Sequence, residues 1–145
     1  MNKIRIIISC LLLPFIIFIA FTFWKIKSKE VFKQKTVLAY EIRKVLGYLM
    51  LDLREAREGS FIGLPVDGQW HERIAFKSSQ LGDLEYIIQN RHLFRVSNGQ
   101  QKLIADNIGD LRIRRQRSAP DIVEVQIEAR NSVSLESNLR IRIRD

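Results

Sequence analysis

Residues 6–24 form an apolar run of nineteen positions without a charged side chain. At about 1.5 Å of rise per residue, a helix of this length reaches roughly 28 Å, which is close to the hydrocarbon thickness of a bilayer. The run therefore predicts a transmembrane helix within residues 1–24. The expected anchor residues are Ile6, Leu12, Pro14, Phe15, Ile19 and Trp24.

Most of the basic excess lies beside this run. Of the formal net charge of +8, residues 1–35 contribute +6 (seven basic, one acidic), which leaves +2 for residues 36–145. A nearly neutral domain lacks the charge that is typical of a nucleic-acid-binding protein. Lys25, Lys27 and Lys29 directly follow the run, so we expect them to contact anionic lipid headgroups.

Residues 25–58 have the spacing of an amphipathic helix that continues from the membrane segment. Apolar residues recur every three or four positions and predict one buried stripe, whereas charged residues such as Arg43, Asp52 and Glu58 are expected on other faces. Gly59 and Ser60 predict the end of the helix at residue 58. The residues expected to pack against the rest of the domain are Leu38, Ile42, Val45, Leu49 and Leu53.

After Gly59 the hydrophobic period changes to two, which predicts an antiparallel sheet head over residues 59–145. The last three strands alternate apolar and charged residues, as expected for a sheet with one buried face. The stripe of the helix is the available cover, so we predict an α+β fold with one long N-terminal helix packed on one antiparallel sheet. The expected strands are residues 73–77, 84–88, 93–96, 111–115, 122–129 and 139–144.

Side chains with catalytic or metal-binding chemistry are few. His71 and His92 have no metal-ligand spacing, and the single cysteine, Cys10, lies in the apolar run and forms no internal disulfide. Gly-rich phosphate loops and nucleophile motifs are absent from the sequence. We therefore expect no enzymatic activity, no cofactor and no metal site.

The most prominent polar feature is a set of arginines near the C-terminus, which forms a candidate anion or partner face. Glu124 and Glu128 are expected on the same outward face, where opposite charges pair across strands, so a solvated charged surface is the favoured interpretation over phosphate binding. No aromatic residue follows Phe94 to stack on bases. The arginines are Arg112, Arg114, Arg115, Arg140 and Arg142.

Five segments, taken in order, resemble a known family. They are Leu51–Arg57, Leu84–Ile88, Leu93–Arg95, Leu103–Ile108 and Leu111–Ile113. In this order and spacing the chain resembles the type IV pilin superfamily, in particular the minor pseudopilins of type II secretion systems and related minor pilins. The resemblance implies a pilin-like fold and a non-enzymatic structural subunit that assembles with other pilin-like subunits through its N-terminal helix.

The resemblance also implies a single-pass protein of the bacterial inner membrane with a periplasmic C-terminal domain. Two features depart from it. The family's leader has a Gly, a cleavage point and Phe-Thr-Leu-x-Glu, whereas this sequence has no Gly before Gly47 and no acid before Glu30, so leader cleavage is not implied. Two basic side chains precede the apolar run and five follow it, which by the positive-inside rule predicts a cytoplasmic C-terminal domain.

Two alternatives to the pseudopilin interpretation stay open. One is a membrane-anchored basic module that binds nucleic acid during DNA uptake through the C-terminal arginines. The other is an anchored scaffold of a different membrane machine. A salt-dependent affinity for DNA and the identity of co-purifying proteins distinguish these possibilities.

Overall fold

A computed structural model describes the backbone of residues 2–143 and the side chains of residues 17–143. In this range the chain forms a long helix α1 (Asn2–Glu55), a short 3-10 helix η1 (Glu58–Ser60) and seven strands. The chain divides into two compact units, Met1–Gln34 and Lys35–Asp145, and the boundary falls inside α1. The predicted α+β class, with one long N-terminal helix and antiparallel β-structure, is confirmed.

The strands form two antiparallel sheets, whereas one was predicted. Strand β4 was not predicted because its first four residues are exposed and show no alternation of apolar and polar positions. The first sheet has the order β1-β2-β3-β4, with β1 Ile74–Ser78, β2 Gly82–Gln89, β3 His92–Ser97 and β4 Gln100–Ala105. The second sheet has the order β5-β6-β7, with β5 Ile108–Gln116, β6 Ala119–Arg130 and β7 Ser134–Arg142.

Tight turns set the register of the first sheet. Asn90 and Arg91, between β2 and β3, have φ of 52° and 65°, and Asn98 and Gly99, between β3 and β4, have φ of 50° and 76°. Two consecutive residues with positive φ match the type I′ turn, whose twist suits a two-residue hairpin. The register then pairs Gln89 with His92 and so fixes which side chains of β2 and β3 face the helix.

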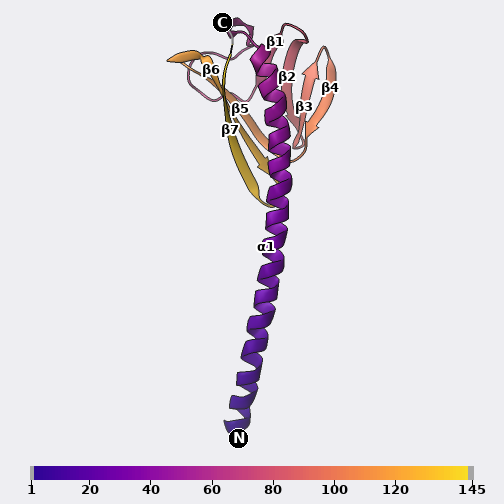
Figure 1. The fold of residues 1–145 in the computed structure, drawn as a ribbon, viewed down its shortest axis with the longest axis vertical. Helices are drawn as coiled ribbons and strands as arrows, with labels where there is room; N and C mark the ends of the chain where they lie inside the picture. The colour runs from indigo at the N-terminus through magenta and orange to yellow at the C-terminus, as the bar shows by residue number, and fades with distance from the viewer. Residues whose placement is uncertain (1, 144–145) are drawn as a thin grey trace. The chain divides into compact units, whose positions relative to one another are not determined.

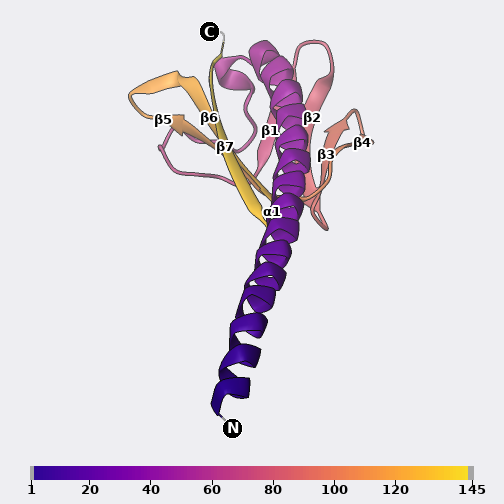
Figure 2. The same ribbon diagram turned by 60° about the horizontal axis from the view of Figure 1, so that its bottom comes forward.

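The stripe of α1 lies against both sheets. Figures 1 and 2 show β2–β4 on one side of the second half of α1 and β5–β7 on the other. A single core cluster contains residues of α1 and of all seven strands. In that cluster Leu38, Ile42, Val45, Leu49 and Leu53 are at most 3% exposed.

Helix α1 ends three residues earlier than predicted. The Ser60 Oγ accepts a hydrogen bond from the Arg57 backbone N–H at 3.0 Å and donates one to the Arg57 carbonyl at 2.7 Å. Arg57 is extended, with φ −101° and ψ 162°. A serine hydroxyl that bonds nearby backbone groups competes with helical hydrogen bonds, so the chain leaves the helix before Arg57. Glu58, expected on a polar helix face, lies in η1 instead.

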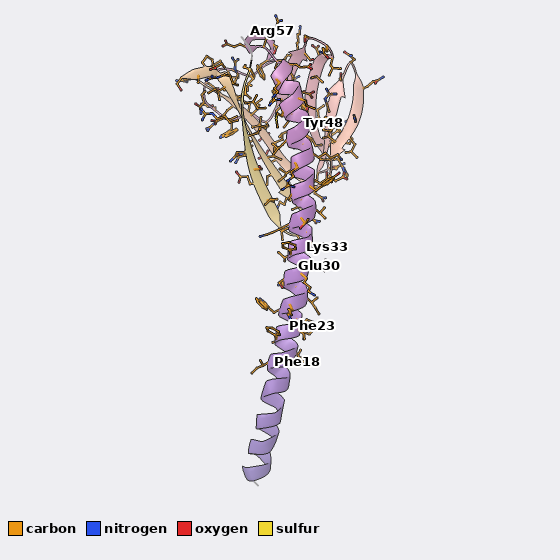
Figure 3. All side chains as sticks on the ribbon, viewed as in Figure 1. Phe18, Phe23, Glu30, Lys33, Tyr48 and Arg57 are labelled. Atoms are coloured by element: carbon orange, nitrogen blue, oxygen red, sulfur yellow. The ribbon has the colours of Figure 1, made fainter. Side chains whose placement is uncertain are left out.

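The first unit exposes large apolar side chains along α1. Phe18 and Phe23 are 64% and 70% exposed, and Figure 3 shows both extending outward from the helix. The Phe21 and Trp24 rings lie 6.1 Å apart, and the Lys25 Nζ lies 5.4 Å from the Phe21 ring centroid. The exposed set is Ile17, Phe18, Ile19, Phe21, Phe23, Trp24, Ile26 and Phe32.

The predicted membrane anchor lies partly outside the described residues. Side chains are described from residue 17 onward, which includes Ile19 and Trp24 and leaves out Ile6, Leu12, Pro14 and Phe15. Among the described residues, no helix is apolar over a stretch long enough to cross a membrane.

Candidate functional site

Four of the five predicted arginines lie on the outward face of the second sheet. Arg112 and Arg114 occupy alternate positions of β5, and Arg140 and Arg142 occupy alternate positions of β7. Each guanidinium lies beside a carboxylate. The pairs are Arg112–Asp110 at 2.6 Å, Arg114–Glu124 at 2.5 Å, Arg140–Glu124 at 3.7 Å and Arg142–Asp121 at 2.9 Å.

Glu124 lies at the centre of this face. The register aligns Arg114, Glu124 and Arg140 in one row across β5, β6 and β7. Gln116 Nε2 donates a further hydrogen bond to Glu124 Oε1 at 2.7 Å. An anionic ligand would have to compete with these carboxylates for the guanidinium groups, so the geometry favours the interpretation as a solvated, charge-paired surface.

Arg115 departs from the predicted face because consecutive residues of a strand point to opposite sides of a sheet. Arg115 is only 5% exposed. Arg115 Nε donates to the Pro120 carbonyl and Nη2 to Glu58 Oε1, both at 3.1 Å, and the guanidinium lies 5.3 Å from the Phe61 ring centroid. Arg115 therefore joins the second sheet to the segment that follows α1, and it is not available on the outward face.

Replacing Arg115 by Ala is expected to lower the free energy of unfolding by about 2 kcal/mol, because the Pro120 carbonyl loses its donor and the packed side chain is removed. The matched change Arg112→Ala, at an exposed position of the same strand, should cost less than about 1 kcal/mol. Urea unfolding of the two variants measures the difference. Equal, small losses would contradict a structural role for Arg115.

Trp70 supplies an aromatic group to the arginine face that the sequence did not indicate. The backbone N–H and carbonyl of the neighbouring His71 bond to Ile113 of β5, both at 2.8 Å. This bridge brings the Trp70 ring to 4.4 Å from the Arg114 guanidinium carbon, a cation–π contact. No aromatic residue follows Phe94 in the sequence, but Trp70, which precedes Arg114 by 44 residues, reaches the arginine face from another part of the chain. A hollow of about 300 Å³ adjoins it.

A buried polar cluster connects α1 to the first sheet. Asp52, expected on a polar face of the helix, is 6% exposed. Arg95 of β3 donates from Nε to Asp52 Oδ2 at 2.6 Å and from Nη2 to Asp52 Oδ1 at 2.8 Å. Tyr86 of β2 donates its hydroxyl to Asp52 Oδ2 at 2.5 Å. Tyr86 and Arg95 are direct partners across β2 and β3, so one carboxylate binds two adjacent strands.

The electrostatics of this cluster favour a structural role. Burial raises the pKa of the Tyr86 phenol well above its ordinary value, and the charge of Asp52 raises it further. The hydrogen bonds from Arg95 to Asp52 raise the pKa of the guanidinium. The phenol therefore stays protonated at neutral pH and does not act as a base or nucleophile. The cluster therefore holds α1 against the first sheet through hydrogen bonds.

Tyr86→Phe should change how stability depends on pH. Because the folded-state pKa of Tyr86 lies above the ordinary value of about 10, its contribution is complete below about pH 10 and is lost as the pH rises toward the folded-state pKa. Above about pH 10 this group lowers the unfolding free energy by about 1.4 kcal/mol per pH unit. When the unfolding free energy is measured in urea from about pH 8 to 12, this part of its decrease with pH should be missing in Tyr86→Phe and present in Tyr40→Phe. Equal slopes in both variants would contradict the prediction.

Each of the two histidines lies within hydrogen-bond distance of a different carboxylate. His71 Nε2 lies 3.1 Å from Asp67 Oδ1, and His92 Nδ1 lies 2.6 Å from Asp106 Oδ1. The Gln69 backbone N–H and the His71 side chain lower the pKa of the Asp67 carboxyl. Within the described part of the chain, three or more metal-ligating side chains do not gather at any point.

Comparisons with known proteins do not add to this geometry. No family model matches the chain, and searches of curated proteins and of solved structures find no match either.

Proposed function

We propose that the chain is a non-enzymatic structural subunit of a pilus-like assembly, a minor pseudopilin of a type II secretion system or a related minor pilin. It acts at the bacterial inner membrane, with a single membrane-spanning helix, and its C-terminal domain faces the periplasm. Its partners are other pilin-like subunits and the lipid bilayer, where Lys25, Lys27 and Lys29 contact anionic headgroups.

One observation carries this proposal. The single helix α1 has an N-terminal part whose large apolar side chains are exposed and a C-terminal part whose apolar stripe is fully buried in the sheet domain. Exposed large apolar groups in a continuous patch mark a surface that meets another protein or a membrane. The helix thus supports one role for the first unit, anchoring and assembly, and another for the second, a stable folded head.

The buried cluster and the charge-paired sheet face also support a structural role. Asp52, Tyr86 and Arg95 satisfy one another, and the outward arginines are paired with carboxylates. These polar groups pair with one another and stabilise the head. The resemblance of the sequence to minor pseudopilins is consistent with such a head.

Topology is the first test. A compartment-sensitive reporter fused after Asp145 is expected to be active in the periplasm, and the intact mass of the membrane form measures whether the N-terminus is processed. A cytoplasmic reporter, as the lysine count predicts, would contradict the proposal.

Site-specific photocrosslinking then tests assembly through the helix. A photoreactive residue at Phe18 or Phe23 is expected to capture other pilin-like subunits in the membrane, because both side chains are exposed. The same probe at Glu136, on the exposed side of β7, is the control. Capture of subunits of an unrelated membrane machine would instead identify an anchored scaffold.

Nucleic acid binding in DNA uptake is a second candidate, favoured by the contact between Trp70 and Arg114. Because the outward arginines are paired with carboxylates, we expect the full chain in detergent to bind single-stranded DNA no more tightly than about 100 µM at physiological salt. Fluorescence anisotropy over a range of salt concentrations measures this. A tight, salt-dependent affinity that Arg114→Gln abolishes would favour the second candidate.

A further inference from the structure

The two sheets leave a groove between them. It has a volume of about 640 Å³ and lies between β2 and β5. One end is closed by the Ile108 N–H, which donates to the Arg91 carbonyl at 2.9 Å, and the other by the paired hydrogen bonds of Ile113 with His71. From Ile108 to Ile113, β5 extends over about 17 Å, enough for an added strand of a few residues. We call this the seam groove.

The β5 wall of the seam groove is an open strand edge. β5 pairs with β6 and is the edge strand of its sheet. The backbone of Ile113 bonds to His71, on the side away from β6. Since backbone groups of a strand alternate in direction, the N–H and carbonyl of Leu111 also point away from β6, into the groove. No backbone hydrogen bond to Leu111 on that side occurs among the described residues.

The β2 wall is open in the same way. Gln89 pairs with His92 next to the two-residue turn, so its backbone groups bond to β3. By alternation, the N–H and carbonyl of Ile88 point to the opposite side. Ile88 is aligned with Leu93 of β3, whereas the strand on its other side, β1, reaches only as far as the pair Ile74–Tyr86, so among the described residues Ile88 has no strand partner on the β1 side. Leu111 and Ile88 thus present unpaired backbone groups to one cavity.

The charge of the groove selects the kind of strand that fits. Four acidic and two basic side chains line it, a formal charge of −2 within a chain of +8. Arg73 pairs with Glu85 at 2.9 Å and Arg112 with Asp110 at 2.6 Å. The two remaining carboxylates are Glu72 and Glu128, and Glu128 accepts a hydrogen bond from the Ser134 hydroxyl at 2.8 Å.

We propose that the seam groove binds an extended segment of a partner polypeptide that carries basic side chains. The segment adds as a strand to the open edge at Leu111, and Ile88 supplies hydrogen-bonding groups from the opposite wall. Main-chain hydrogen bonds provide the affinity, and the carboxylates of Glu72 and Glu128 select Lys or Arg at the exposed positions of the bound strand.

Peptide binding to the full chain in detergent micelles tests this proposal. The probe is a labelled seven-residue peptide of alternating Lys and Val, compared with a Glu and Val peptide and with the Lys and Val peptide N-methylated at alternate amides. We expect affinity for the basic peptide to exceed that for either comparison peptide by about tenfold or more. Hydrogen exchange at the Leu111 and Ile88 amides should slow by about tenfold when the peptide binds.

Paired substitutions provide the matched control. Glu72→Gln together with Glu128→Gln should weaken binding of the basic peptide about threefold to tenfold, whereas Glu136→Gln, on β7, should leave it unchanged. The proposal would be overturned if the basic peptide did not bind, or if the N-methylated peptide bound equally well. It would also be overturned if peptide binding slowed hydrogen exchange only at amides of β4 or β7. If hydrogen exchange at the Leu111 and Ile88 amides slowed with rising protein concentration in the absence of peptide, the proposal would be overturned, and the groove would instead bind a second copy of this chain.

Discussion

Asp52→Ala is expected to lower the free energy of unfolding by about 3–5 kcal/mol. The change leaves the guanidinium of Arg95 and the hydroxyl of Tyr86 without their shared acceptor beneath the helix. The Arg95 side chain is 14% exposed, so the charge that loses its partner is largely shielded from water, and its loss of a partner costs more than the same loss at an exposed charge.

Urea unfolding of the full chain in detergent, followed by circular dichroism of the sheet domain, measures this loss. The matched control is Asp121→Ala, which breaks the exposed pair with Arg142 and should cost less than about 1 kcal/mol. A triple variant, Asp52→Ala with Tyr86→Phe and Arg95→Leu, should recover much of the stability, since apolar groups of similar volume often replace a buried polar network at little cost. Equal losses of unfolding free energy for Asp52→Ala and Asp121→Ala would contradict the prediction that Asp52 holds α1 against the first sheet.

Leu49→Ala is the second large effect, with an expected loss of about 2–5 kcal/mol. Leu49 is fully buried between α1 and the sheets, so truncation removes apolar contacts and leaves a cavity that the two sheets cannot close freely. The helix provides its own control two residues later. Leu51 is 66% exposed, and Leu51→Ala should change the unfolding free energy by less than about 0.5 kcal/mol.

Thermal or urea unfolding of the two leucine variants discriminates sharply because both changes are chemically identical and affect the same helix. If both variants lost little stability, the second half of α1 would not be held by its stripe. If both lost several kcal/mol, Leu51 would be buried against a partner, and the measurement repeated at several protein concentrations would reveal that association.

The helical stripe, β5, β6 and the second half of β7 could be predicted because their signals are local. Leu38 to Leu53 recur at helical spacing, and β5, β6 and β7 alternate apolar and polar residues. Such periodicity depends only on which face of an element is buried. The division into two sheets depends instead on which strands pair over long distances, and no local period encodes it. The transition occurs near Asn107, whose φ is 60°.

The buried cluster was missed because its members are far apart in the sequence. Asp52 is separated from Tyr86 by 34 residues and from Arg95 by 43. One signal was present. Asp52 follows Leu49 by three positions, which places it on the buried stripe of the helix, and a carboxylate at such a position requires donors from another element. Trp70 gave no comparable signal, because its contact with Arg114 depends on the path of an irregular loop.

The separation of the head into two sheets has a consequence for how it unfolds. β4 and β5 follow each other in the chain but lie in different sheets, so hydrogen bonds do not unite the head into one ladder. The second half of α1 and both sheets contribute to one shared core. We expect each sheet to open as a separate cooperative unit once the helix detaches, so native-state hydrogen exchange should reveal two groups of amides with distinct opening free energies. Packing of the helix against both sheets places those two groups around one core.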